Sequence, residues 1–275
     1  MIDAVRGAVG FLTRVPVGHS ERAWRALTRS PWAFPVVGYP LGLLVAVPVA
    51  AAPALSLPPV TGATAGLALL LATTGITHLD GVADLGDAAV VHGDAADRLA
   101  VLEDTTLGVG GAVAVGVALL GLWSGFAAAA RRPVVVAVTL VVAAEVGARA
   151  ATATTVCLGT AAHEGLGSQF ADASGPRGVV PVLAAVTPLW LLPLVATLPT
   201  AGAPDGGLSG VVGVAPAGLL ALVSGVLAGA AVAVVVGLRL ADRLLGGVTG
   251  DVFGAVNELA RVLGLHVGVV AWTLS

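Results

Sequence analysis

Long apolar stretches alternate with short segments that are polar or contain glycine and proline. A helix that crosses a bilayer needs about 20 mostly apolar residues. Seven stretches approach this length, at residues 34–53, 60–77, 108–130, 133–157, 179–198, 210–238 and 252–273. Glycine and alanine are frequent in them, as close helix packing in lipid requires. The pattern predicts an all-α fold, a polytopic integral membrane bundle of about seven transmembrane helices that forms one domain over residues 1–275.

Composition supports burial in lipid. Hydrophobic residues make up 57% of the chain and charged residues only 11%, against about 25% charged in soluble domains. So few charges cannot cover a water-exposed surface of this size, whereas membrane lipid can solvate the rest. The first sixteen residues lack a long apolar core closed by a small-residue cleavage site, so we expect them to be retained as an interfacial helix.

The arginines fall mainly on one side of the predicted bundle. If the spans alternate, one side holds the N-terminal segment, an acidic loop at 78–107, the loop 158–178 and a last loop, 239–251, which contains the glycine-rich turn 246–251. This side has nine arginines and nearly all loop carboxylates, whereas the other has only Arg131 and Arg132. The positive-inside rule predicts that the first side faces the cytoplasm of a multi-pass cell-membrane protein.

Several classes of chemistry are excluded by what the chain lacks. All thirteen basic residues are arginine, so neither a P-loop lysine nor a Schiff-base lysine exists. The single cysteine, Cys157, excludes disulfide frameworks and zinc-thiolate sites. Net charge is -3 and no basic stripe with interleaved aromatics occurs, which argues against nucleic acid as a partner.

The densest chemistry lies in an acidic stretch directly after the second predicted span, THLDGVADLGDAAVVHGDAADRLAVLEDTTLG at 77–108. Asp80, Asp84 and Asp87 are spaced i, i+4 and i+7, so on a helix they share one face. Three carboxylates this close repel one another unless a cation lies between them, and hard oxygen ligands favour Mg²⁺. Because Mg²⁺ completes its shell with water and phosphate oxygens, the cluster predicts phosphoryl transfer. The alternative is a solvated loop that only ends a transmembrane helix.

The other polar residues of this stretch allow two interpretations. Asp94 and Asp97 are typical of a helix cap and first turn after Gly93. Asp104 could contact metal or phosphate, or simply end a short surface helix. His78 could donate to a phosphate oxygen or stabilise a leaving group, and it could equally bind a carbonyl at a helix end.

A second motif, GGVTGDVFGAVNE, occupies residues 246–258 and precedes the last apolar stretch. Gly247 and Gly250 permit close backbone approach, Thr249 adds a hydroxyl, and amides at a helix start can hold phosphate. Asp251 could join the substrate site or serve as the N-cap.

Ionisable groups inside predicted membrane helices are costly and usually functional. Asn257 and Glu258 are therefore candidate substrate-binding residues, although a structural Glu258–Arg261 pair at i, i+3 is the alternative. Glu145 and Arg149 form a similar pair at i, i+4, as a structural ion pair or a substrate contact.

HLDGVADLGDA at 78–88 resembles HLDGxADxxDG, the signature of the cobalamin synthase family, the adenosylcobinamide-GDP ribazoletransferases. Four further motifs match in the family's order: FLTRVPV at 11–17, FPVVGYPLG at 34–42, EGLGSQF at 164–170 and GGVTGDVFGAVNE at 246–258. The resemblance runs nearly end to end and implies a polytopic membrane enzyme that requires Mg²⁺.

It also implies the reaction. A hydroxyl of α-ribazole, or of its 5′-phosphate, attacks the cobinamide-linked phosphorus of adenosylcobinamide-GDP, GMP leaves, and the nucleotide loop of adenosylcobalamin closes. On this interpretation Asp80, Asp84 and Asp87 hold the metal against the diphosphate, and either Asp84 or Asp104 acts as base. His78 is the third candidate catalytic residue.

One departure from the family concerns phosphate binding. After the acidic helix the family usually has a basic-Asp-Ser-Arg run, where this chain has Glu103, Asp104, Thr105 and Thr106. Two basic groups are therefore missing, and Arg98 is the nearest candidate to replace them as a substrate contact.

Two other functions compete with the transferase. Intramembrane carboxylates are also used by ion-coupled transporters of small solutes, but these acids tend to lie near the bilayer midplane, whereas this cluster lies outside the span. A phosphotransferase acting on CDP-alcohol lipids needs a DGxxAR pattern, which this chain lacks. The sequence also allows a homo-oligomer.

Overall fold

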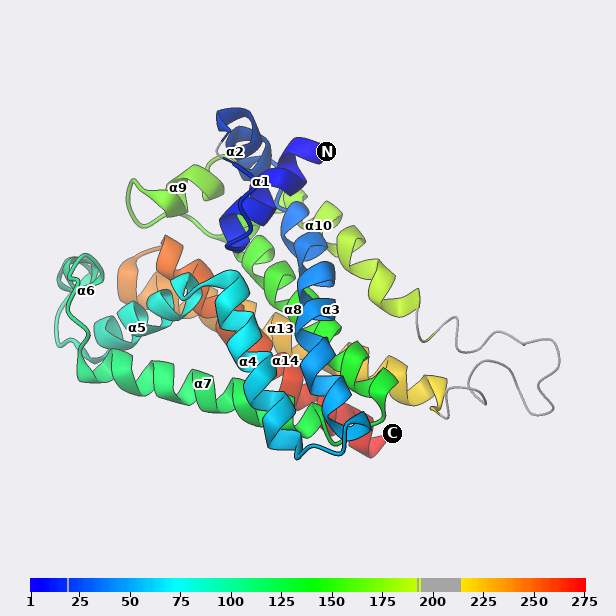
Figure 1. The fold of residues 1–275 in the computed structure, drawn as a ribbon. Helices are drawn as coiled ribbons and strands as arrows, with labels where there is room; N and C mark the ends of the chain where they lie inside the picture. The colour runs from blue at the N-terminus through cyan, green and yellow to red at the C-terminus, as the bar shows by residue number, and fades with distance from the viewer. Residues whose placement is uncertain (19, 192, 194–213) are drawn as a thin grey trace.

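The structure is a computed structural model that describes residues 1–18, 20–191, 193 and 214–275. Within these ranges the chain is helical, with no strand, and its one β-bridge joins Ala161 to Val248. The prediction of an all-α membrane bundle is confirmed for this part of the chain. Figure 1 shows the helices packed around α8, which lies buried along most of its length.

Five of the described helices are long and apolar enough to cross a membrane: α3 (Ala33–Ala54), α7 (Val109–Ala129), α8 (Val134–Leu158), α13 (Pro216–Leu245) and α14 (Gly250–Leu274). A sixth span is possible only if α4 (Pro59–Thr74) and α5 (Thr77–Val90) count as one bent pair. The described part of the chain therefore supports five or six spans. The predicted span 179–198 begins as α10 (Val179–Val186) and η2 (Thr187–Trp190), and then leaves the described residues.

Short connections make successive helices antiparallel. Residues 55–58 join α3 to α4, residues 130–133 join α7 to α8, and residues 246–249 join α13 to α14. As a result the first turns of α7 and α14 lie at the same end of the bundle as α5 and the last turns of α8 and α13. Backbone bonds between Val248 and the segment after α8 tie this end together, with Val248 N–H donating to Thr160 O at 2.7 Å.

The N-terminal segment forms two short helices at this end, α1 (Ile2–Leu12) and α2 (Glu21–Thr28). The expected helix at the start of the chain is therefore present. Aromatic contacts hold it in place: Phe170 of α9 (Leu166–Ala171) lies 5.2 Å from Phe11, 5.3 Å from Trp24 and 6.4 Å from Phe253, ring centre to ring centre. These rings connect both N-terminal helices to the start of α14.

Two segments predicted as loops are largely helical. The acidic loop 78–107 contains most of α5 and all of α6 (Ala95–Leu102), and α13 continues to Leu245, so the last loop shrinks to four residues. In α5 the apolar side chains of Leu79, Ala83 and Ala88 are buried. The helix α13 ends at Gly246, whose φ of 74° is the left-handed conformation that glycine adopts without strain.

Candidate active site

Glycines bring α5 into backbone contact with the first turns of α14. A Cβ on Gly81 would lie 2.5 Å from Asp251 O, and one on Gly254 would lie 3.1 Å from His78 Cα. Neither helix could approach so closely with larger residues at these positions. The contact places the acidic helix against the start of α14, and so joins the two motifs that the sequence singled out.

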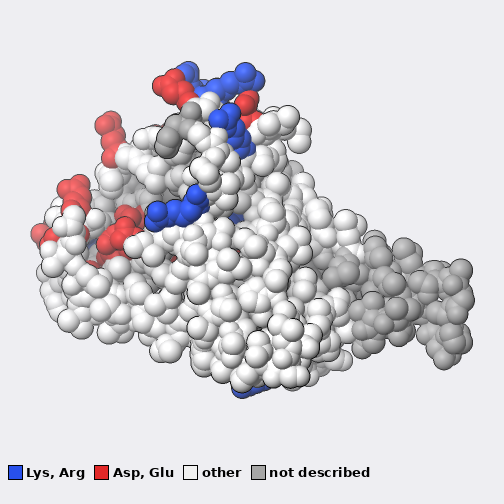
Figure 2. Space-filling model, in the orientation of Figure 1, with Lys and Arg blue, Asp and Glu red and all other residues white. Residues whose placement is uncertain are grey.

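The helix α5 is too short to cross a bilayer by itself. It is bent by 94° from α4, and its 14 residues reach only about 21 Å, short of a hydrocarbon core of about 30 Å. Its carboxylates therefore lie at the bundle end, where Figure 2 shows acidic side chains gathered at one edge of a largely uncharged face.

On α5, Asp84 lies among the negative charges of three other carboxylates. Burial raises its pKa to about 6, and the negative charges of Asp251, Asp80 and Asp87 add to the rise. Asp80 is exposed, and Asp84 and Asp251 are partly buried. Asp251 thus joins two of the three predicted metal ligands from a different helix.

Asp87 differs from the prediction, because it caps a helix. Its two oxygens accept hydrogen bonds from Gly108 N–H at 2.7 Å and Gly111 N–H at 2.8 Å, and the side chain is buried. These amides belong to the first turn of α7, where a carboxylate satisfies unpaired donors and the helix dipole. Of the predicted trio of Asp80, Asp84 and Asp87, the structure therefore assigns Asp87 a capping contact with α7.

The remaining carboxylates fit a hard cation as an open site. Among the described residues no group of three or more His, Cys, Asp or Glu side chains is placed to hold a metal ion. Mg²⁺, however, commonly takes one or two protein carboxylates and fills its shell with water and phosphate. Asp80, Asp84 and Asp251 form no salt bridge with any arginine in the described ranges.

His78 points from α5 towards polar residues of α14. Its Nδ1 lies 3.1 Å from Asn257 Nδ2 and 3.6 Å from Glu258 Oε1, and Asn257 Nδ2 donates to Glu258 Oε1 at 3.2 Å. The direction of the His78–Asn257 bond depends on which ring nitrogen carries the proton. The structure therefore brings three predicted site residues together.

Behind His78 the charges form one buried network. Glu258 pairs with Arg261 on the same helix, Arg261 Nε reaches Glu145 Oε1 on α8 at 2.6 Å, and Glu145 Oε2 bonds Arg149 Nη1 at 2.5 Å. All four side chains are buried. Both ion pairs that the spacing predicted are confirmed, and the Glu145–Arg261 contact that joins them was not predicted.

The glycine-rich turn is used for packing. A Cβ on Gly247 would lie 2.5 Å from Thr160 O, and one on Gly250 would lie 3.1 Å from the side chain of Leu166. Thr249 is the N-cap of α14, where its hydroxyl accepts from Val252 N–H and donates to Asp251 Oδ2 at 3.2 Å. The N-cap is therefore Thr249 and not Asp251, which leaves the Asp251 carboxylate beside α5.

Two other predicted site residues make local contacts. Arg98 donates to Ala88 O at 3.3 Å and to Gly93 O at 3.4 Å, and so closes the end of α5. Asp104 is exposed and accepts from the Thr106 hydroxyl and N–H, bonds that lower its pKa. A carboxyl group with a lowered pKa is a weak base. The predicted cap at Asp94, with Asp97 in the first turn of the helix, is confirmed, and the two residues form a capping box.

Arg14 was not predicted as a site residue. It is exposed, and its guanidinium lies against Gly75, which has a φ of 74° in the bend between α4 and α5. A Cβ on Gly75 would lie 2.6 Å from Arg14 Nε. The sequence signal was its place in FLTRVPV, but only folding brings this motif to the start of α5.

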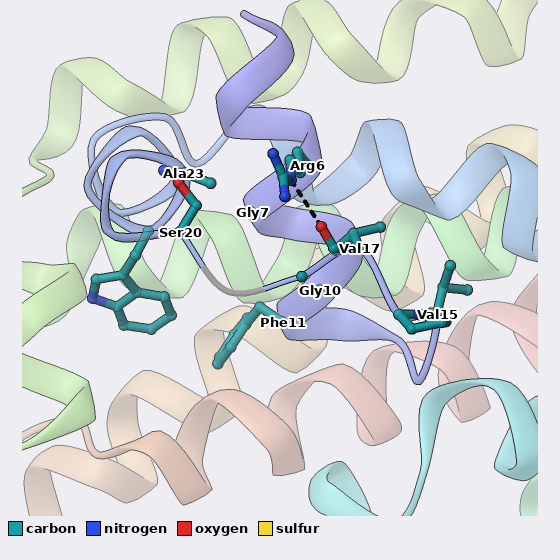
Figure 3. Close-up of a pocket in the computed structure, with 11 residues that line it drawn as sticks. Arg6, Gly7, Gly10, Phe11, Val15, Val17, Ser20 and Ala23 are labelled. Atoms are coloured by element: carbon teal, nitrogen blue, oxygen red, sulfur yellow. Dashed lines mark hydrogen bonds between the residues drawn. The ribbon is translucent and has the colours of Figure 1, made fainter.

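An apolar pocket of about 370 Å³ lies between α1 and the turn that follows it. Figure 3 shows Phe11 at its wall and Arg6 above it, with Arg6 Nε donating to Val17 O at 2.9 Å. Arg6 is the only charged group among the eleven residues that line it. This pocket lacks carboxylates, so it does not supply the chemistry predicted for the acidic helix.

Comparisons with known proteins agree over the whole chain. Residues 4–269 match the family described as cobalamin-5-phosphate synthase. A protein of Halorubrum lacusprofundi named adenosylcobinamide-GDP ribazoletransferase is 48% identical over 99% of both chains. Relatives of the same name from Haloquadratum walsbyi, 44% identical over the full length of both, and Ralstonia nicotianae, 31% identical over 98% of this chain and 95% of the relative, also match. No solved structure matches this chain.

These findings give no support to the transporter hypothesis. The relatives are named as transferases, and the intramembrane carboxylates Glu145 and Glu258 are paired with buried arginines. The resemblance inferred from HLDGVADLGDA is confirmed by the family match and by full-length identity. The chain belongs to the cobalamin-5-phosphate synthase family of membrane transferases.

Proposed function

We propose that this protein transfers the adenosylcobinamide-phosphate group of adenosylcobinamide-GDP to α-ribazole or α-ribazole 5′-phosphate. The new bond joins the ribazole hydroxyl oxygen to the cobinamide-linked phosphorus, the bond from that phosphorus to the bridging oxygen breaks, and GMP leaves with that oxygen. The observation that carries the proposal is the contact of Gly81 with Asp251. This contact joins the acidic helix to the start of α14. The relatives that match this chain over their full length are named for this activity.

Asp80, Asp84 and Asp251 are the residues that would hold Mg²⁺. When bound, the ion would supply charge neutralisation for the diphosphate and for the departing phosphate. Asp84 would also be the candidate to accept the proton of the attacking hydroxyl, because a partly buried carboxyl group with a pKa of about 6 is a better base than an exposed aspartate. Asp87 would contribute indirectly, by fixing α7 against α5.

His78 and Arg14 would contact the phosphate groups of the substrate from two sides. In the tautomer in which Nδ1 accepts from Asn257, the His78 Nε2 proton would be available to a phosphate oxygen or to the leaving group. Arg14 carries a permanent charge at the start of α5, which suits an arginine contact to phosphate. Arg98 bonds to backbone carbonyls and is therefore a weaker candidate for this contact than Arg14.

The direct experiment uses detergent-purified protein with adenosylcobinamide-GDP, α-ribazole and Mg²⁺, with release of GMP and formation of cobalamin followed together. We expect turnover that stops on chelation of Mg²⁺ and returns when the ion is restored. Asp84→Asn should abolish turnover, and Arg14→Gln should raise the KM for adenosylcobinamide-GDP. Folded protein that consumes neither substrate would rule the proposal out.

The same proposal places the site on the cytoplasmic face of the cell membrane. Arg22, Arg25, Arg239 and Arg243 lie at the site end of the bundle, whereas Arg131 and Arg132 lie at the other end. This is the bias that the positive-inside rule describes. Labelling of a cysteine placed at Asp104, in intact cells and in open membranes, would report the orientation. Labelling in intact cells by an impermeant reagent would contradict it.

A further inference from the structure

A second pocket, of about 480 Å³, lies apart from the acidic helix, between the end of α2, the start of α3 and the turn before α10. Its walls are Arg29, Pro31, Ala173, Ser174, Gly175, Pro176, Arg177 and Gly178. Nothing in the proposed reaction uses these residues.

The pocket is held in shape by contacts at its base. The Ser174 hydroxyl donates to Thr28 O at 3.0 Å, and so fastens the turn to the end of α2. Gly178 lies against α8, since a Cβ there would be 2.8 Å from Cys157 Sγ and 3.8 Å from Pro31 Cγ. Two prolines, Pro31 and Pro176, stiffen the remaining wall.

The charge of the pocket is positive and uncompensated by its own walls. Arg29 and Arg177 are both exposed, and neither forms a salt bridge with a described acidic residue, whereas the nearby Arg22 and Arg25 pair with Asp3 and Glu21. No carboxylate is among the eight lining residues. Two guanidinium groups around one hollow are suited to the oxygens of a phosphate.

The position of the pocket identifies the source of that phosphate. It opens where α3, a candidate span, begins at Ala33 and where α10 begins at Val179. On α10 the apolar side chains of Val180 and Leu183 are 71% and 58% exposed, as expected of a helix face that contacts lipid chains. A headgroup in the pocket would place its acyl chains along this face.

We propose that Arg29 and Arg177 form a binding site for the phosphate of an anionic lipid headgroup, with the lipid chains lying against α10. Basic pockets between helices at the cytoplasmic membrane surface bind such headgroups. The site is separate from the proposed phosphoryl-transfer site, and it does not depend on the reaction proposed above.

The test measures thermal unfolding of detergent-solubilised full-length protein with added phosphatidylglycerol, phosphatidylcholine or inorganic phosphate. Three proteins are compared: the natural sequence, the pocket variant Arg29→Gln with Arg177→Gln, and a control variant, Arg239→Gln with Arg243→Gln. The control removes two exposed arginines from the same end of the bundle. Each single pocket variant is measured too, in case the double variant does not fold.

We expect phosphatidylglycerol to raise the unfolding temperature of the natural and control proteins and phosphatidylcholine to leave it unchanged. In the pocket variant the lipid should bind about tenfold more weakly or worse, since each arginine near the surface contributes to the attraction. Equal effects of the two lipids, or an equal loss in the control variant, would overturn the site. Stabilisation by inorganic phosphate alone that matches phosphatidylglycerol would overturn the assignment to lipid.

Discussion

Gly81→Ala tests whether the contact between α5 and α14 sets the geometry of the site. The added Cβ would lie 2.5 Å from Asp251 O and 2.8 Å from Asp251 Cα. Both are backbone atoms of the first turn of α14, so no side chain can rotate away. Ordinary contact begins at 3.4 Å, and the two helices must therefore separate locally by about 0.9 Å (3.4 minus 2.5).

The expected effect of Gly81→Ala on stability is small, whereas its expected effect on activity is large. Overpacking costs about 1–3 kcal/mol, whereas replacing glycine by alanine inside a helix gains about 1 kcal/mol, so the net loss of stability is about 0–2 kcal/mol and the protein should still fold. Misplacing reacting groups by about 1 Å can reduce the rate by about 100-fold. We therefore expect kcat for GMP release to fall about 100-fold in a protein whose unfolding temperature changes little.

The matched control is Gly116→Ala in α7, where an added Cβ meets nothing within 4 Å. This variant gains the same helix propensity and should keep its full activity. Both variants are assayed for GMP release at saturating substrates and for thermal unfolding in detergent. A Gly81→Ala protein that turns over like the natural one would show that the close approach of α5 to α14 does not position the site.

Three further changes test individual contacts. Asp87→Asn replaces one of the two acceptors that cap α7 with a donor, and should lower the unfolding free energy by about 1 kcal/mol; an unchanged unfolding temperature would contradict the capping role. Glu145→Gln leaves the buried Arg149 and Arg261 with a single carboxylate, that of Glu258, and should lower the unfolding free energy by about 3–5 kcal/mol. The charge-balanced double variant Glu145→Leu with Arg149→Leu should recover most of that loss of stability. Asp104→Asn changes only an exposed turn, so kcat should stay near that of the natural protein, and a loss comparable to that of Asp84→Asn would restore Asp104 as a candidate base.

Hydropathy predicted most spans closely because lipid imposes one simple requirement. The predicted 34–53, 108–130, 133–157 and 252–273 differ from the helices observed by no more than two residues at either end. The predicted 210–238 begins outside the described residues, and its helix continues to Leu245. In the segment 60–77, hydropathy continues through Gly75 but the helix does not. The positive φ of Gly75 ends α4, and the 94° bend starts a new helix.

Residue types indicated the kind of chemistry more clearly than they indicated which residues make up the site. The helical spacing of Asp80, Asp84 and Asp87 was confirmed, but spacing cannot reveal that the start of α7 lies beside Asp87 and uses its charge. Asp251 and Arg14 are distant in sequence from α5, and only tertiary contacts bring them close. Glycine-rich turns are ambiguous for a similar reason, since close approach can serve a ligand or, as at Gly247, a neighbouring backbone.

The buried ion pairs within the membrane helices help to position the first turn of α14. Buried charges in a membrane helix are costly unless paired, and Glu258 and Glu145 pair with two arginines, which leaves these four groups without net charge. The bond from Arg261 to Glu145 crosses to α8 and so fixes the rotation of α14 about its axis. Asp251 lies one heptad before Glu258, on the same helix face, so that rotation also directs Asp251 towards α5. The network therefore stabilises the position of the site, and His78, a residue of α5, contacts Glu258 and so links α5 to the network.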